Sequence, residues 1–261
     1  MRIHHLNCAT MRPPLAPPMV AHVLLLERPD GLVLVDSGFG TGDIADRKRL
    51  GRPFLGMVRP ALDGAETALA QVRALGHDPA EVTDIVLTHL DLDHAGGLGD
   101  FPNARVHVHA RELAAAKNPP LRERTRYVQG QWAHGPRWEE HVEGGDDWFG
   151  FASVTALADD VLLLPLHGHT RGHAGVAVRA GDGRWLLHAG DAFFHGDQLA
   201  DPPRCPASLA AFQRLMAVDN RARVANLERL QELARERAGE VTIVCAHDKG
   251  QYDALRGGPG A

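Results

Sequence analysis

Cysteine is scarce in this chain of 261 residues, and the few cysteines present argue against a disulfide-based fold. Cys8, Cys205 and Cys245 are an odd number and lie far apart. Since a disulfide framework needs closely organised pairs, the sequence predicts a protein of a reducing compartment. The N-terminal residues 1–7 also lack the apolar core of a signal peptide, so we expect a cytoplasmic location.

Long apolar runs and an excess of positive charge are missing as well. No apolar stretch approaches the roughly 18 residues that a membrane-spanning helix needs, so we expect no membrane contact. The net charge of −5, with histidine neutral, argues against a nucleic-acid surface. We expect a small-molecule substrate as the partner, and a homodimer is one assembly that the sequence leaves open.

Histidine, by contrast, is abundant, with 16 residues, and four side chains able to bind a metal fall in one short stretch. Residues 84–87 predict a buried strand, and His89, Asp91, Asp93 and His94 follow it directly. Buried together without a cation, these groups would be costly to desolvate. The stretch therefore predicts a divalent metal site, with a solvated loop as the alternative. The glycine pair at 96–97 is expected to let the backbone turn tightly.

The segment from Thr88 to Gly97 resembles the H-x-H-x-D-H signature of the metallo-β-lactamase superfamily, with Asp91 where the second histidine usually stands. Four further segments match the family pattern in the same order along the chain: Val35-Asp36-Ser37-Gly38, Gly168-His169-Thr170-Arg171-Gly172-His173, His188-Ala189-Gly190-Asp191-Ala192 and Ala246-His247-Asp248. The resemblance implies an α/β fold, a four-layer αββα sandwich with a metal centre at its edge. We expect one domain over residues 1–261, because the candidate ligands span most of the chain.

The resemblance also implies which side chains hold two metal ions. One ion would be bound by His89, Asp91 and His169. The other would be bound by Asp93, His94 and His247. Asp191 would bridge the two ions, Asp36 would support the site from behind, and His173 would hydrogen-bond behind its turn. Zinc is the expected metal, and the oxygen-rich ligand set leaves iron or manganese as alternatives.

Two such ions would bind a carbonyl oxygen and activate a shared water, with Asp93 and Asp191 as the catalytic carboxylates. The interpretation is a binuclear hydrolase that opens an ester-like bond, namely a lactone or a compact ester. Three alternatives stay open. They are a phosphodiester or thioester hydrolase, an iron-dependent redox enzyme similar to the sulfur dioxygenases, and a binding protein with a degenerate site.

The substrate pocket is predicted from an aromatic segment and one substitution. Residues 121–150 show no clean periodicity but contain Trp132, Trp138 and Trp148, so we interpret them as a loop that walls the pocket. The alternative is that these aromatic side chains fill a small core of their own. Phe194 stands where the acyl-homoserine-lactone hydrolases of this superfamily carry tyrosine, and phenylalanine cannot donate a hydrogen bond. A compact, partly aromatic ester is therefore expected over long-chain acyl-homoserine lactones.

Periodicity predicts most of the remaining elements. Strands are expected at 2–8, 19–27, 31–35 and 241–245, and helices at 65–75, 207–218 and 222–238. Alternation in the segment 105–109 places His107 and His109 on one face, which we interpret as a solvent face.

Overall fold

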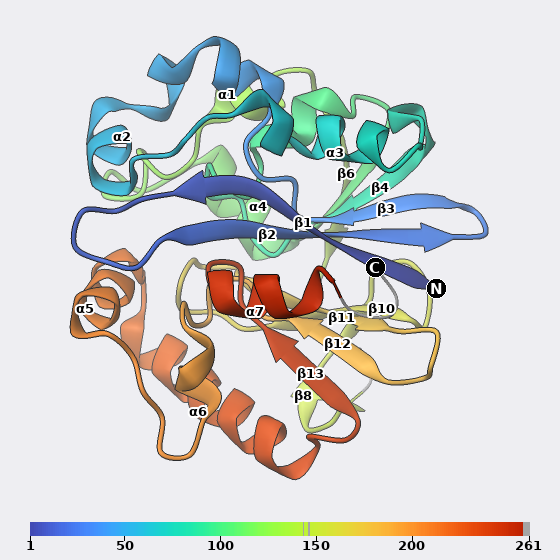
Figure 1. Cartoon of the computed structure of the whole chain (residues 1–261), viewed down its shortest axis with the longest axis vertical. Coiled ribbons are helices and arrows are strands. Elements are labelled where there is room, and N and C mark those ends of the chain that lie inside the picture. Colours follow the sequence, from blue (N-terminus) through green and yellow to red (C-terminus); the bar gives the residue numbers. More distant parts are fainter. Residues whose placement is uncertain (143, 146, 258–261) are drawn as a thin grey trace.

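The computed structural model describes residues 1–142, 144–145 and 147–257. Two β-sheets lie against each other, with helices on the outer side of each and one further helix, α7, in front of them beside β1 and β2 (Figure 1). The helices are α1 (Thr41–Ala45), α2 (Arg52–Val58), α3 (Ala68–Ala74), α4 (Ala110–Lys117), α5 (Ala207–Met216), α6 (Asn220–Glu236) and α7 (Lys249–Leu255). This arrangement confirms the predicted αββα sandwich.

The N-terminal sheet has six strands in the order β1-β2-β3-β4-β5-β6. Their bounds are β1 (Arg2–Met11), β2 (Met19–Arg28), β3 (Gly31–Val35), β4 (Val82–Val86), β5 (Arg105–His109) and β6 (Arg137–His141). The first three strands run antiparallel, and β3 to β6 run parallel.

The second sheet has five strands in the order β13-β12-β11-β10-β9. Their bounds are β9 (Val154–Thr155), β10 (Val161–Pro165), β11 (Ala174–Arg179), β12 (Trp185–His188) and β13 (Val241–Val244). Strands β12 and β13 are parallel, and the other neighbours are antiparallel. A separate hairpin joins β7 (Asp147–Trp148) to β8 (Phe151–Ala152).

Side chains of successive residues on β2 face opposite layers, because a strand has a period of two residues. Leu24 and Leu26 pack between the two sheets, in the same cluster as Leu163. Leu25 points to the other side, where it belongs to a cluster with Val72 of α3. The predicted stripe on α6 packs on the second sheet in the same way. These three apolar layers fix the sheets relative to their helices.

Two sequence interpretations need correction at the level of the fold. His107 and His109 are buried, because β5 lies inside a sheet that is covered on both faces. The segment 121–150 contains a 3₁₀ turn at Gln129–Trp132 and the strand β6, so it is more ordered than a loop. Residues 143 and 146 of this segment lie outside the described residues.

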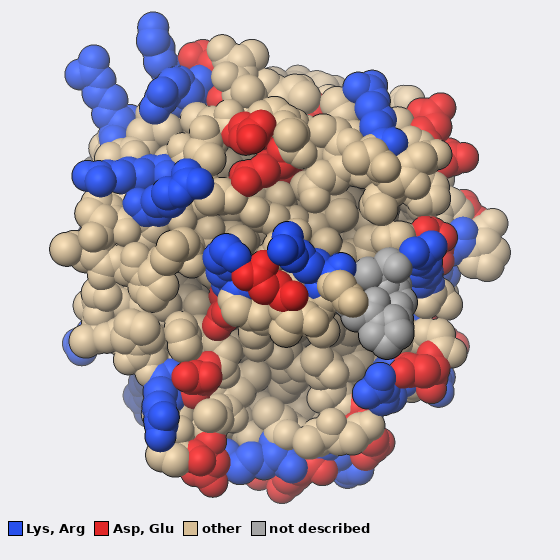
Figure 2. All heavy atoms as spheres, in the orientation of Figure 1, with Lys and Arg blue, Asp and Glu red and all other residues tan. Residues whose placement is uncertain are grey.

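Charged side chains of both signs lie interspersed over the face shown in Figure 2. Lys and Arg gather at its upper left, over α1 and α2, where Arg47, Lys48 and Arg52 are exposed. None of the described helices is long and apolar enough to cross a membrane.

The strand directions bring the sequence motifs to one edge of the sandwich. Strands β3 and β4 are parallel, so the residues that follow them emerge at the same edge. In the second sheet, β10, β12 and β13 also share one direction, since β11 is antiparallel to both β10 and β12. The polar segments after these five strands therefore meet in space.

Candidate metal centre

Three of the predicted ligands, His89, Asp91 and His169, form one group that we call the first set. Asp91 Oδ2 lies 3.5 Å from His89 Nε2 and 3.0 Å from His169 Nε2. All three side chains are buried. The turn after β4 supplies two of them and the turn after β10 supplies the third, so distant segments of the chain converge here.

Asp93, His94 and His247 form a second group of potential ligands, the second set. His247 follows β13, and its Nε2 lies 3.7 Å from Asp93 Oδ2. The ring centroids of His94 and His247 are 5.4 Å apart. These are the two groups of three that the family resemblance implies.

Asp191 lies between the two sets and contacts both. Its Oδ2 is 3.2 Å from His169 Nε2, and its Oδ1 is 3.4 Å from His94 Nε2. His247 Nε2 lies near both oxygens, 3.1 Å from Oδ1 and 3.2 Å from Oδ2. A carboxylate in this position can bridge two cations.

Unsatisfied atoms show that these residues fit divalent cations. His89 Nε2, His94 Nε2 and Asp191 Oδ1 are buried, yet they have no hydrogen-bond partner among the described residues. Buried polar atoms are normally paired, so several unpaired atoms aimed at one point need an explanation. Imidazole nitrogens and carboxylate oxygens are ligands that zinc, iron and manganese accept.

Asp36 contacts His94 of the second set from behind. Its Oδ2 accepts a hydrogen bond of 2.8 Å from His94 Nδ1, which leaves Nε2 of that ring free to face the site. The main-chain N–H and the hydroxyl of Thr88 donate to the same carboxylate. These bonds hold Asp36 at a φ of 59°, a left-handed conformation that few residues other than glycine adopt. His247 is oriented separately, by a bond of 2.8 Å from its Nδ1 to Val20 O.

His173 is hydrogen-bonded at both ring nitrogens behind the turn that carries Asp191. Its Nε2 accepts a 2.8 Å hydrogen bond from the main-chain N–H of Asp191, so the ring's proton is on Nδ1, which donates to Leu166 O. The ring thereby fixes the turn that carries Asp191.

Two buried charged residues support the first set although no sequence pattern indicates them. Glu112 on α4 is fully buried and accepts bonds from Leu90 N, Gly172 N and Thr170 Oγ1 at 3.0, 2.9 and 2.6 Å. It therefore ties the turn after β4 to the turn after β10. Glu112 stands in an ordinary helical segment with no motif around it, so the sequence gives no signal of this role.

Arg126 is the second such residue, and it contacts the first set directly. Its Nε lies 2.9 Å from Asp91 Oδ1, and its terminal nitrogens donate to the carbonyl oxygens of His169 and Met216. The only sequence signal is a run of arginines at 122, 124 and 126, which is typical of an exposed segment. Asp91 thus divides its oxygens, with Oδ1 on Arg126 and Oδ2 towards the two imidazoles.

The glycine pair at 96–97 has a different cause from the one predicted. Neither residue has a positive φ. A Cβ on Gly97 would lie 2.6 Å from Ser37 O, and one on Gly96 would lie 2.7 Å from Gly38 O. Close approach of the turn after β3 therefore requires these glycines, and the same approach brings Asp36 to His94.

Comparison with known proteins agrees with this geometry. A model of the metallo-beta-lactamase superfamily matches residues 16–247. The chain belongs to the metallo-β-lactamase superfamily. A probable metallo-hydrolase of Mycobacterium tuberculosis is 46% identical over 260 residues, which are 98% of this chain and 83% of the relative. The N-acyl homoserine lactonase AttM of Rhizobium johnstonii is 29% identical over 236 residues, 90% of this chain and 84% of the relative.

Solved structures share the fold of this superfamily member. An N-acyl homoserine lactone hydrolase with N-hexanoyl-L-homoserine at its catalytic metal centre superimposes with a TM-score of 0.76 at 19% identity. The match covers 98% of this chain and 96% of that one. AidC, a dizinc quorum-quenching lactonase, superimposes with a TM-score of 0.60 at 17% identity, over 89% of this chain and 74% of that one. Membership in this superfamily supports metal-dependent hydrolysis.

The electrostatic environment differs between the two sets. Burial lowers the pKa of His169 to about 4, so this imidazole is neutral at neutral pH. Burial opposes ionisation of Asp91, but Arg126 and His89 hold its pKa well below the ordinary value. In the second set burial disfavours the protonated imidazoles. Nearby carboxylates, led by Asp191, outweigh this effect and raise the pKa values of His94 and His247. Cation binding at the second set should therefore compete with protons more strongly than at the first.

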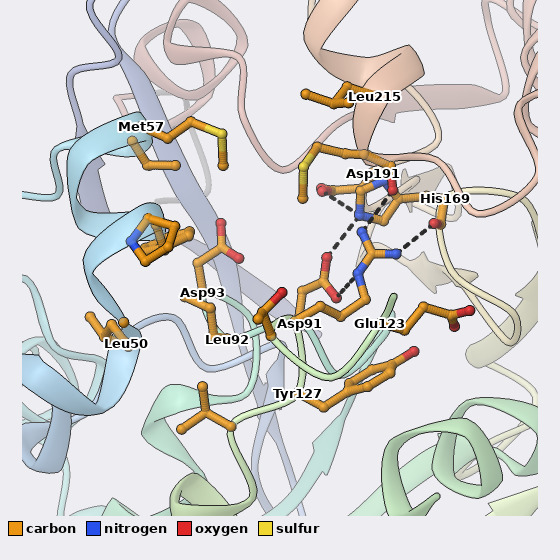
Figure 3. Close-up of a pocket in the computed structure, with 18 of the residues that line it drawn as sticks. Leu50, Met57, Asp91, Leu92, Asp93, Glu123, Tyr127, His169, Asp191 and Leu215 are labelled. Atoms are coloured by element: carbon orange, nitrogen blue, oxygen red, sulfur yellow. Dashed lines mark hydrogen bonds and ion pairs between the residues drawn. The ribbon is translucent and has the colours of Figure 1, made fainter. Parts of the chain in front are cut away.

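A pocket of about 900 Å³ opens over the two sets. Figure 3 shows Asp91, Asp191 and His169 turned towards one another at one side of it, with Asp93 nearby and the apolar side chains of Met57 and Leu215 farther out. Phe194 lines the pocket as predicted, with its ring centroid 4.8 Å from that of His247. The two ligand sets are thus reached through an opening whose lining contains apolar side chains and several arginines, among them Arg122 and Arg124.

The prediction that three tryptophans wall this pocket is wrong. None of the described residues that line it is a tryptophan. Trp132 and Trp138 pack against each other in the cluster beside the N-terminal sheet. Trp148 packs on Trp185 in the cluster beneath the second sheet. The segment's tryptophans fill two cores, and the pocket receives Arg122 to Val128 from it instead.

Proposed function

We propose that this protein is a binuclear metal-dependent hydrolase that opens a lactone or a related ester. The observation that carries the proposal is the pairing of two three-residue ligand sets around Asp191 beneath a pocket with both apolar and charged side chains in its wall. Relatives named as N-acyl homoserine lactonases support the choice of a cyclic ester. We propose zinc as the metal, supported by the nitrogen and oxygen ligands and by the dizinc lactonase of the same fold.

The residues divide the work of hydrolysis among them. Divalent cations held by the two sets would polarise the substrate carbonyl and lower the pKa of a water molecule towards neutrality. Asp191 keeps the two sets at a fixed separation, and Asp36 and Glu112 keep the turns behind them rigid. The Asp93 carboxylate lines the pocket, where it can take a proton from the attacking water and return it to the leaving oxygen. Ring opening then yields one hydroxyl group and one carboxyl group.

The pocket walls favour an apolar substituent on the substrate. They include Met11, Met19, Phe54, Met57 and Leu215. Methionine side chains adapt to ligands of different shape, so the wall does not require a flat ring. The case for an aromatic substrate rested on the three tryptophans, which lie elsewhere. We therefore propose a lactone or compact ester with an apolar acyl group.

The test is a panel of acyl lactones, alkyl and aryl esters, thioesters and bis-aryl phosphodiesters, with zinc-reconstituted protein. We expect lactones or esters to give the highest kcat/KM. Dominant turnover of a thioester or a phosphodiester would refute the assignment and favour the corresponding alternative. Phe194→Tyr adds the missing hydroxyl and should raise kcat/KM on homoserine lactones by about tenfold, the effect of one hydrogen bond to a developing charge. Phe212→Tyr, farther from the ligands, is the matched control.

A further inference from the structure

Arg126 occupies an unusual place for a guanidinium group, inside a site that should attract cations. It is buried, and one edge of it lies on Asp91 at 2.9 Å. A positive charge beside a cation site weakens cation binding unless a negative charge offsets it. Asp91 supplies that negative charge, so the two side chains form a neutral pair.

We propose that Arg126 is a positioning residue for the first set and that Asp91 and Arg126 act as one unit equivalent to a single neutral ligand. This inference rests on the proposed function. Arg126 holds Oδ1 of Asp91 and thereby directs Oδ2 to the point faced by His89 and His169. The pair delivers one ligand oxygen with no net charge, as a neutral imidazole delivers one nitrogen.

The other contacts of Arg126 extend its influence to a second ligand. One terminal nitrogen donates to the main-chain carbonyl oxygen of His169 at 2.9 Å, and the other donates to Met216 O at 2.9 Å. The guanidinium therefore joins the turn after β4, the turn after β10 and the end of α5. Two of the three members of the first set, Asp91 and His169, depend on it for their position.

The pairing predicts that the effect of losing Arg126 changes sign with the residue at position 91. In the wild-type background, Arg126→Gln removes the ion pair with Asp91 and a donor to the carbonyl oxygen of His169, and it should weaken zinc binding at one site about tenfold. Asp91→His alone leaves a buried guanidinium uncompensated beside the cation and should also weaken binding. Adding Arg126→Gln to Asp91→His removes that charge and should strengthen binding about tenfold relative to Asp91→His alone.

The experiment is a zinc titration of the metal-free proteins in competition with a chromophoric chelator, with melting temperatures measured in parallel. The matched control is Arg28→Gln, which removes an arginine paired with Asp160 at 2.7 Å at the opposite edge of the N-terminal sheet. We expect Arg28→Gln to leave both zinc dissociation constants within about twofold of the wild-type values, since among the described residues Arg28 shares no contact partner with either ligand set.

The outcomes separate this inference from the proposed function. A wild-type chain that binds no zinc contradicts the proposed function itself. A chain that binds two zinc ions, with the same fold-change for Arg126→Gln in both backgrounds, refutes the pairing alone. If Arg126→Gln does not fold by itself, the double variant decides: zinc binding tighter than in Asp91→His supports the pair, and equal, weaker or no binding overturns it.

Discussion

The two ligand sets lie side by side but are supported by opposite means. Behind the second set stands a carboxylate, Asp36, which accepts a hydrogen bond from the His94 imidazole. Behind the first set stands a guanidinium, Arg126, which pairs with the Asp91 carboxylate. A metal ligand can thus be held in place by a partner of either charge, provided that the ligand keeps one nitrogen or oxygen directed into the metal site. Because the Asp91–Arg126 pair has no net charge, whereas the second set contains the Asp93 carboxylate, we expect the first set to hold its metal more weakly.

The largest effect should follow from breaking the second set. Asp93→Asn and His94→Ala each remove a ligand, and we expect kcat/KM to fall by at least about a hundredfold with one metal lost per chain. Metal analysis beside circular dichroism and kinetics checks this. Asp84→Asn is the matched control, since Asp84 is also buried and paired with a histidine, His107, but lies away from the site. Full metal content and activity in both ligand variants would contradict the assignment.

The supporting residues should show smaller and separable effects. Asp36→Asn should weaken the site of the second set by about 10- to 100-fold, because His94 loses its charged acceptor. Glu112→Gln should weaken metal binding at the first set by a similar factor. The substitution replaces one accepting oxygen, which holds the turns after β4 and β10, by an NH2 group that can only donate. Two dissociation constants from a zinc titration distinguish these effects. If both variants changed the same constant, the division into two independently supported sets would be wrong.

The smallest effect on catalysis is expected from the tryptophans. Trp148→Ala should lower the free energy of unfolding by about 3–5 kcal/mol, because it leaves a cavity against Trp185 and Phe151. KM for the best substrate should change by less than about twofold, since this side chain does not line the pocket. Leu121→Ala, at a residue that is 78% exposed, serves as the control for stability. A large rise in KM with unchanged stability would restore the original pocket interpretation.

The sequence predicts the two ligand sets because each ligand stands beside a strand end in a recognisable segment. The fold then needs only strand direction to bring those segments together. Arg126 and Glu112 could not be predicted, because their roles depend on contacts with residues such as His169 and Thr170 that are far away in sequence. The prediction that the tryptophans line the pocket is wrong for a related reason. Composition shows that aromatic side chains need burial, but it does not show which core or pocket buries them.

A zinc titration of the metal-free wild-type chain, monitored by calorimetry and checked by elemental analysis, tests directly whether two metal sites exist. We expect two zinc ions per chain with separate affinities. Asp91→Ala should lose the weaker binding event, and His94→Ala should lose the tighter one. A single event, no binding, or the loss of the same event in both variants would contradict the assignment of two metal sites.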